Sequence, residues 1–349
     1  MALLLERGYN GTQSGGREDL SDLIANVDAR STPFTSMAKK GKKPGNVLMG
    51  WQMDAYEDPQ VTGTVDGTDV DMTSAGSFTN PAQNRALMQN YAQIFRRVFR
   101  VSSLANEIQV VAGVKSELAN GIAKKLVEIK RDMEMTFLND ADAQVDNGTN
   151  EAYLTKSMGS FLHASGTGGG GSDITVPSAF RCTAIDTTAS ASLAESNVQD
   201  VLKTLFTNTG IIRDYDLLLG TSLKRAFTNF TQSVTSTAAT ESSHDVTASP
   251  IKTFNQEANT KSYINCIDLF EGDFGRLRLH PSTFIAESGS AVAFKGYAIP
   301  FDQVEIRYGK LPQIKELTDN GGGPARLIEA VAALVVYNPK GVGYFNGAS

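Results

Sequence analysis

Side chains that could carry catalysis or bind a metal are sparse in this chain. It has three histidines, His163, His244 and His280, and none has a second histidine or a cysteine at the spacing of metal ligands. The two cysteines, Cys182 and Cys266, stand far apart and form no CxxC pair. A Ser–His–Asp site assembles in space, but no GxSxG motif marks a nucleophile. We therefore expect no metal site, no catalytic site, and cysteines that act as small buried hydrophobes.

A glycine-rich tract at residues 165–172, SGTGGGGS, is the candidate for cofactor binding. It contains a G-x-G-x-x-G pattern at Gly166, Gly168 and Gly171. A dinucleotide site requires a strand before these glycines and a helix directly after them. The residues that follow, SDITVPS, include Pro177 and cannot open that helix. No GxxxxGKS/T phosphate loop exists either, so the sequence predicts no cofactor and a flexible linker at this tract.

Composition and charge narrow the class of protein further. The chain has 349 residues, of which 41% are hydrophobic, and this is enough for a sizeable core. Its formal net charge is -6, whereas a sequence-specific DNA reader usually carries a basic balance. This charge still permits weak contact between one local face and nucleic acid. No stretch has the apolar length of a membrane span, so we expect no membrane partner.

Three clusters of charged residues are the candidate contact sites. They are Asp66, Asp69 and Asp71 in an acidic stretch, Lys39, Lys40, Lys42 and Lys43 in a lysine run, and Arg96, Arg97 and Arg100 on a later strand. The acidic stretch begins like a calcium loop but lacks the required glycine and the closing glutamate. It is therefore either a solvated loop, or an ion site or salt-bridging partner for basic residues of an adjacent subunit.

The lysine run and the arginines favour different partners. The lysine run is a solvated turn, a phosphate contact without sequence preference, or a partner for the acidic stretch. On a strand, alternate residues share a face, so Arg96 lies with Arg100. Arg97 lies on the other face with Phe95 and Phe99. This arrangement favours packing with ionic contacts to a neighbouring chain over a stacking platform for nucleic acid.

Two predicted strands position the acidic stretch. NVLMGWQMDAY (46–56) predicts a strand, and NRALMQNYAQIFRRVFRVSS (84–103) predicts a second long extended run. Together they form a long hairpin, which alone is only marginally stable in water, so its stability should come from neighbouring chains. Residues 1–45 predict an arm with too little apolar surface to fold alone, apart from a short amphipathic helix at 20–27.

The clearest element is a helix of about seven turns over residues 115–139. Apolar side chains recur every three or four positions along one face of this helix. They are Leu118, Ile122, Leu126, Ile129, Met133 and Phe137. Charged residues, Glu134 among them, mostly occupy the other positions. A lone apolar stripe of this length predicts a helix that acts as a scaffold for a sheet.

The remaining segments complete an α+β fold. Residues 192–210 predict a helix that stops at Gly210, residues 214–220 a buried strand, and residues 221–230 a second helix. This strand between two helices predicts a compact α/β subdomain. Alternating strands close the chain. The last of them, around 330–337, is apolar on both faces and should be central in its sheet.

This order of elements resembles the major capsid proteins of tailed bacteriophages, whose fold is named after phage Hong Kong 97. It is similar in particular to one capsid-protein family of podovirus-like and related tailed phages. The segments that carry the resemblance are DLIANVDARSTPFTSMAKKGK, GWQMDAYEDP, NYAQIFRRVFRVS, AKKLVEIKRDMEMTFLND and FGRLRLHPSTF. Together with the late strands they span most of the chain, and their order carries more weight than any single motif.

The resemblance implies a structural subunit that is not an enzyme. It implies self-assembly into pentamers and hexamers of an icosahedral shell around double-stranded DNA, put together in the host cytoplasm. The parts would be an N-terminal arm (1–45), an extended β-hairpin loop over a neighbour (46–100), a peripheral domain with the long spine helix (101–190), an axial α/β domain (191–290) and return strands of the peripheral domain (291–349). Scaffold, portal and decoration proteins are the further partners that it implies.

Two other functions share features with this sequence. The first is an encapsulin-like shell of a cellular compartment, which has the same fold and encloses protein cargo. The second is a virion decoration protein. The long charged helical assembly segment of the fold's founding member is missing here. A scaffold is therefore either a separate protein or unnecessary. No lysine and asparagine pair stands out for a crosslink between subunits.

Overall fold

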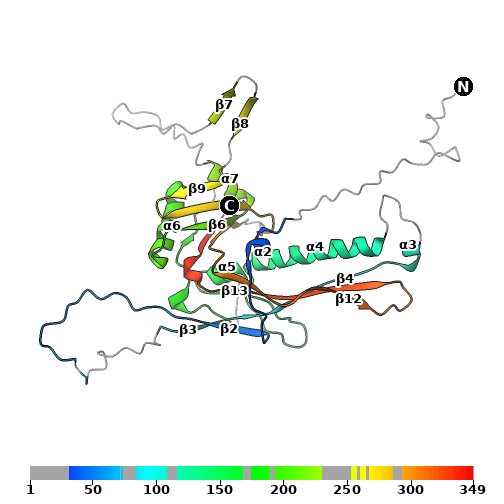
Figure 1. The fold of residues 1–349 in the computed structure, drawn as a ribbon, viewed down its shortest axis with the longest axis horizontal. Coiled ribbons are helices and arrows are strands. Elements are labelled where there is room, and N and C mark those ends of the chain that lie inside the picture. The colour runs from blue at the N-terminus through cyan, green and yellow to red at the C-terminus, as the bar shows by residue number, and fades with distance from the viewer. Residues whose placement is uncertain are drawn as a thin grey trace.

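The fold combines helices and sheets in an elongated molecule (Figure 1). The computed structural model describes residues 31–70, 72–73, 84–107, 116–167, 174–188, 193–229, 253–257, 260–264, 267–285 and 293–348. The helix predicted at 20–27, Asp71 of the acidic stretch, His244 and Cys266 lie outside these ranges. None of the helices in the described ranges is long and apolar enough to cross a membrane.

A four-stranded sheet runs along the molecule in the order β1-β12-β13-β4. Its strands are β1 (Lys39–Lys40), β12 (Val304–Leu317), β13 (Ala325–Val336) and β4 (Gln93–Arg100). The apolar strand β13 lies between β12 and β4, which confirms the central position predicted from its sequence. The pairing of β12 with β13 shifts register twice between Tyr308 and Gln313, as at a β-bulge.

The long helix α4 (Glu117–Phe137) lies along this sheet (Figure 1). It begins after Ser116, whose hydroxyl accepts a hydrogen bond from the backbone of Ala119 at 3.3 Å. Its apolar stripe packs on β4, β12 and β13. The helix approaches β4 so closely that a Cβ atom at Gly121 would lie 2.4 Å from the ring of Phe99. A larger residue at this crossing would require the Phe99 ring to move, so the glycine permits the close approach of α4 and β4.

A second sheet of six strands forms a compact block with two helices (Figure 1). Its order is β5-β14-β11-β6-β10-β9, with β5 (Ile185–Asp186), β14 (Gly343–Ala348), β11 (Ala293–Ile299), β6 (Arg213–Leu219), β10 (Gly275–Pro281) and β9 (Leu269–Gly272). Helices α6 (Glu195–Thr209) and α7 (Thr221–Asn229) pack against it. Helix α6 ends at Gly210 with φ 67°, the left-handed conformation that favours glycine, so the predicted stop is confirmed.

A two-stranded hairpin carries the acidic stretch. Strand β2 (Leu48–Met53) pairs antiparallel with β3 (Ala86–Tyr91), with Trp51 opposite Met88. The extended run predicted for 84–103 divides at Ala92, because β3 pairs with β2 whereas β4 pairs with β13. The loop that follows β2 leads away from the body of the molecule (Figure 1).

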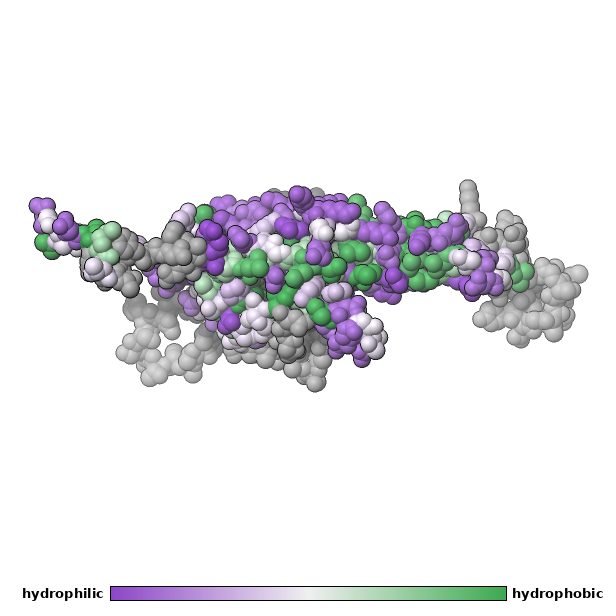
Figure 2. Space-filling view, turned by 90° about the horizontal axis from the view of Figure 1, so that it is seen from below, coloured by the Kyte–Doolittle hydropathy of each residue, from purple (hydrophilic) through white to green (hydrophobic). Residues whose placement is uncertain are grey.

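Short elements complete the chain around one hydrophobic core. They are α2 (Pro33–Met37), α3 (Ser103–Glu107), α5 (Met158–Leu162), the 3-10 turns η2 (Ser178–Phe180) and η5 (Pro339–Gly341), and a separate hairpin of β7 (Thr253–Glu257) and β8 (Thr260–Ile264). The core cluster is continuous from the β2–β3 hairpin through α4 to the six-stranded sheet. Figure 2 shows a thin, elongated body with apolar residues gathered along the middle of the displayed face.

Candidate functional site

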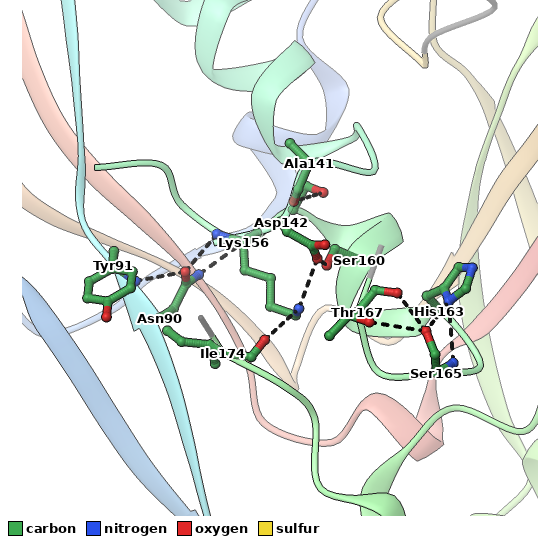
Figure 3. Close-up of polar contacts among 11 residues, drawn as sticks. Asn90, Tyr91, Ala141, Asp142, Lys156, Ser160, His163, Ser165, Thr167 and Ile174 are labelled. Carbon is green, nitrogen blue, oxygen red and sulfur yellow. Dashed lines mark hydrogen bonds and ion pairs between the residues drawn. The ribbon is translucent and has the colours of Figure 1, made fainter. Parts of the chain in front are cut away.

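The histidines form no catalytic arrangement in the described part of the chain. His280 Nε2 lies 3.0 Å from Asp216 Oδ1 on the neighbouring strand, and no described hydroxyl or thiol contacts this ring. His163 Nδ1 lies 2.7 Å from Ser165 Oγ within one exposed turn, and no described carboxylate contacts this ring (Figure 3). The described residues also contain no group of three or more metal-ligating side chains. The functional features of the described residues are instead the buried polar contacts that hold the β2–β3 hairpin, the loop after α4 and the short helix α2 in place.

The β2–β3 hairpin joins the rest of the fold at Asn90, whose side chain is fully buried. Its Nδ2 donates to Thr155 Oγ1 at 3.0 Å, to the carbonyl of Lys156 at 3.3 Å and to that of Leu334 at 2.7 Å. Its Oδ1 accepts from the backbone N–H of Lys156 at 2.7 Å and of Tyr91 at 2.8 Å (Figure 3). One amide thus ties β3 to residues 155–156 and to β13, and it fixes the base of the hairpin.

Lys156 itself places a buried amine beside a carboxylate. Its Nζ lies 3.3 Å from Asp142 Oδ1 and donates to the carbonyl of Ile174 at 3.0 Å (Figure 3). Ser160 Oγ donates to the same carboxylate, and the Phe161 ring lies 5.7 Å from the amine. Burial lowers the pKa of the Lys156 amine, and the Asp142 charge acts in the opposite direction. Removing either partner would leave an uncompensated buried group, so the pair holds the loop after α4 in place.

We expect the substitution Asn90→Ala to lower the free energy of unfolding by about 3 kcal/mol. The change leaves several buried N–H and C=O groups unsatisfied, and each such group costs about 1–3 kcal/mol. Chemical denaturation of both proteins measures the difference. Gln89→Ala is the matched control, since this half-buried amide lies on the other face of β3 and should change stability by less than about 0.5 kcal/mol. Equal losses in the two variants would contradict the role of Asn90.

The end of α4 is held against the six-stranded sheet. Lys295 of β11 forms an ion pair with Asp140, and the Tyr344 hydroxyl of β14 donates to Asp140 Oδ1 at 3.2 Å. The Tyr297 hydroxyl donates to the carbonyl of Leu138 at 3.0 Å, and its ring stacks on Tyr344 with centroids 5.3 Å apart. Burial raises the pKa of both tyrosines, so both stay neutral donors. These contacts set the position of the six-stranded sheet relative to α4.

Glu134 joins the short helix α2 to α4. We predicted this residue among the charged positions outside the apolar stripe, and that was wrong, because its side chain is fully buried. Its Oε1 accepts from the backbone N–H of Phe34 and its Oε2 from that of Thr35, both at 2.8 Å. A carboxylate here satisfies N–H groups that the first turn of a helix leaves free. Burial raises the pKa of Glu134, while the two backbone hydrogen bonds lower it in part.

The stability difference between the natural chain and Glu134→Gln should depend on pH. Because the pKa is raised in the folded state, the folded chain keeps this proton at pH values where the unfolded chain, with a pKa of about 4.3, has lost it. The contribution of Glu134 is therefore largest below about pH 4.3 and is lost as pH rises through the folded pKa. Denaturation at a series of pH values should show the glutamine variant gaining on the natural chain as pH rises. A constant difference would contradict the raised pKa.

Two of the arginines that we predicted to contact a neighbouring chain form ion pairs within their own chain. Arg97 forms a two-point ion pair with Asp132 of α4, with both N–O distances 2.6 Å. Arg96 lies on the opposite face and contacts Glu329 of β13 at 2.8 Å. The hydrogen bonds that Arg97 donates to Asp132 raise the pKa of its guanidinium. The guanidinium of Arg100 lies against the β12–β13 turn, 2.7 Å from where a Cβ of Gly322 would be.

The lysine run lies beside β12. Lys39 Nζ donates to the carbonyl of Asp302 at 3.5 Å. Lys40 and Lys43 line a groove of about 660 Å³ together with residues of the middle of β12. The side chains of Lys40, Lys42 and Lys43 are exposed and form no ion pair with another described residue. In the acidic stretch, Asp66 and Asp69 are exposed as well.

The predicted stripe of α4 divides into two halves. Ile129, Met133 and Phe137 are buried, with at most 2% exposed. Leu118, Ile122 and Leu126 are only half-buried within the single chain. Ile129, Met133 and Phe137 belong to the core cluster, whereas Ile122 and Leu126 are only partly buried and pack against it.

The thiol of Cys182 is inert, as predicted for a cysteine without a CxxC partner. It is buried and donates to the carbonyl of Val342 at 3.1 Å. Burial raises its pKa to about 12, so it does not ionise near neutral pH.

Sequence reasoning missed the three buried polar anchors Asn90, Glu134 and Lys156. A signal existed for Asn90, because strand alternation places it on the same inward face as Met88. Glu134 follows Met133 and stands three residues before Phe137, on the border of the apolar stripe. Lys156 gave no such signal, since it lies in an irregular segment without periodicity.

A long helix along a four-stranded sheet, a compact second sheet and a projecting hairpin define the class of tailed-phage capsid folds. The structure is similar to the capsid structure of the cyanophage P-SCSP1u (TM-score 0.56, 7% identity, 97% of this chain and 96% of that chain). It is also similar to the capsid of Myoviridae phage XM1 (0.55, 8%, 95% and 96%) and to a chain of Mycobacterium phage Adephagia (0.55, 13%, 95% and 94%). At these identities the likeness establishes the fold.

The sequence identifies the family within this class. Residues 7–349 match the SU10 major capsid protein family, and the chain belongs to it. The major capsid protein of Escherichia phage Phieco32 is 27% identical over 172 residues, which are 45% of this chain and 47% of that protein. The match therefore spans about half the length of this curated relative. The family consists of structural capsid proteins, which confirms the expectation of a phage capsid subunit that is not an enzyme.

Proposed function

We propose that this chain self-assembles into pentamers and hexamers of an icosahedral shell that encloses double-stranded phage DNA. Membership in a major capsid protein family supports a shell. The observation that carries self-assembly is the loop after β2, which projects from the body and exposes apolar side chains, with Val61 99% and Val65 76% exposed. Apolar residues gathered on a segment that does not touch its own chain favour burial against another chain.

The proposed parts of the subunit follow the fold of phage Hong Kong 97. Helix α4 and the four-stranded sheet would form the peripheral domain, with α4 as its spine, and the six-stranded sheet would lie in the axial domain at the capsomer axes. The extended loop would lie over a neighbouring subunit, and the arm would run beneath or beside others. Because β4 pairs with β13, the free part of the extended loop lies between β2 and β3.

Further partners belong to the same proposal. Scaffold, portal and decoration proteins would join the shell, which would be put together in the host cytoplasm and become part of the virion. Contact with the packaged DNA would be weak and without sequence preference, since the net charge is -6 and the exposed lysine run is short.

Negative-stain electron microscopy of the purified chain, expressed alone and then with scaffold candidates, tests the proposal. Closed or irregular shells are the expected result. The contents of the shells then distinguish the functions: nuclease-protected double-stranded DNA in particles from infected cells supports the phage capsid. A defined protein cargo would instead favour a cellular compartment. Small monodisperse particles under every condition would contradict self-assembly.

A further inference from the structure

A basic groove lies beside β1 and the middle of β12. Its lining residues include Lys40, Lys43, Lys310, Tyr308, Leu311 and Gln313. Lys310 is paired with Glu329 at 3.0 Å, whereas the charges of Lys40 and Lys43 have no ionic partner among the described residues. The side chain of Leu311 is 54% exposed. The groove thus combines uncompensated positive charge with an apolar contact surface.

The loop between β2 and β3 has the complementary chemistry. Residues 54–80 contain six carboxylates and no lysine or arginine. In the described part of this loop, acidic residues such as Asp66 and Asp69 alternate with the exposed apolar side chains Val65 and Val70. An acidic segment with apolar side chains fits a basic groove with an apolar wall, because both charge and buried area then favour the contact.

No residue from the described part of the loop lines the groove of its own chain, and the side chains of that part are exposed. In Figure 1 the loop leads away from the body on the side opposite the far ends of β4 and β12. We propose that the groove receives the acidic loop of a second copy of this chain. The proposal rests on self-assembly as proposed above and names the surface that accepts the loop. A contact of this kind is head-to-tail, and repeated head-to-tail contacts close into rings.

Reversal of charge on each side of the contact tests the pairing. The variant Lys40→Glu with Lys43→Glu has an acidic groove and an acidic loop. The variant Asp66→Lys with Asp69→Lys keeps the basic groove and carries two lysines in place of two carboxylates in the exposed stretch 65–70 of the loop. Each variant alone should give at least about tenfold fewer particles than the natural chain, since like charges then face each other. The chain that carries all four substitutions should form particles again, because the two lysines of the loop then face the two glutamates of the groove.

A mixture of the two reversed variants separates contacts between chains from contacts within a chain. Favourable contacts in the mixture require that the two variants alternate around a ring. Alternation is possible only in rings with an even number of subunits, so the mixture should restore hexamers but not pentamers. Native mass spectrometry of the capsomers measures this. Particles at natural yield from either single variant, or no rescue in the mixture, would overturn the proposal.

Binding of a peptide to the groove can be measured without assembly. This measurement tests the groove separately from the proposed function. A fluorescent peptide of residues 54–72 should bind the natural chain, and Lys40→Glu with Lys43→Glu should weaken this binding by about tenfold. The control Lys124→Glu with Lys203→Glu makes the same change in net charge at other exposed positions and should bind as the natural chain does. Equal binding by all three proteins, or none by the natural chain, would overturn the groove. Peptide binding without any shells would count against the proposed function alone.

Discussion

Deletion of residues 60–75 should leave a folded monomer that forms no shells. In the described part of this segment the side chains are exposed, so their removal takes little from the core of the chain. The base of the hairpin stays intact, since Trp51 and Met88 still pair and Asn90 keeps its hydrogen bonds. Circular dichroism and thermal unfolding should match those of the natural chain, while electron microscopy should show no particles.

The length of the loop is separated from its chemistry by a matched variant. Replacement of residues 60–75 by a glycine and serine linker of equal length keeps the span but removes the carboxylates and the valines. This variant should fail to assemble as well. Normal particles from the deletion variant would show that the loop is not an assembly element. Particles from the linker variant alone would show that only the span matters.

The substitution Met133→Asp should abolish folding. Met133 is 2% exposed and lies between Ile129 and Phe137 on the buried half of α4. An unpaired carboxylate at this position would have to stay charged in an apolar environment or fold only when protonated. We expect a loss of more than about 4 kcal/mol, which is a large part of the stability of an ordinary domain. Solubility, size-exclusion chromatography and near-ultraviolet circular dichroism measure the outcome.

Two controls show whether the effect comes from burial. Met133→Leu conserves the volume of the side chain and should cost less than about 1.5 kcal/mol. Lys130→Asp places the same carboxylate on the exposed face of the same helix and should leave the chain folded. A soluble, monodisperse Met133→Asp protein with native circular dichroism would show that the buried face of α4 had been placed wrongly.

The regular elements of this fold were predictable because they have strong periodicity. The long helix was expected over 115–139 and extends over Glu117–Phe137. The strand around 330–337 was expected at the centre of a sheet and is the end of β13. The extended run at 84–103 was predicted as one piece. Its break at Ala92 was hidden, since a strand that changes partners keeps its alternation on both sides of the break.

The contacts between elements were less predictable. Arg96 and Arg97 were predicted to contact a neighbouring chain, and this stays a prediction. Their ion pairs within the chain were not predictable, because a sequence does not show that β13 lies beside β4, and β13 and α4 supply the carboxylates. Leu118 and Ile122 have the same spacing as Met133, yet they remain half-buried within the chain. Periodicity predicts which face of a helix is apolar, and it does not predict how far along the helix the covering elements extend.

The hydrogen bonds of Asn90 at the base of the hairpin affect the position of a loop tip that lies far from them. From Met53 to Asp66 the chain covers 13 residues, so the tip lies up to about 40 Å from its attachment. A tilt of about 5° at Asn90 would therefore move the tip by about 3–4 Å, which is the width of a hydrogen-bonded contact. The position of the loop tip therefore depends strongly on how rigidly the base of the hairpin is held. If the loop reaches a neighbouring subunit as proposed above, the hydrogen bonds of Asn90 and the buried side chains of the hairpin would together limit the range of angles over which it does so.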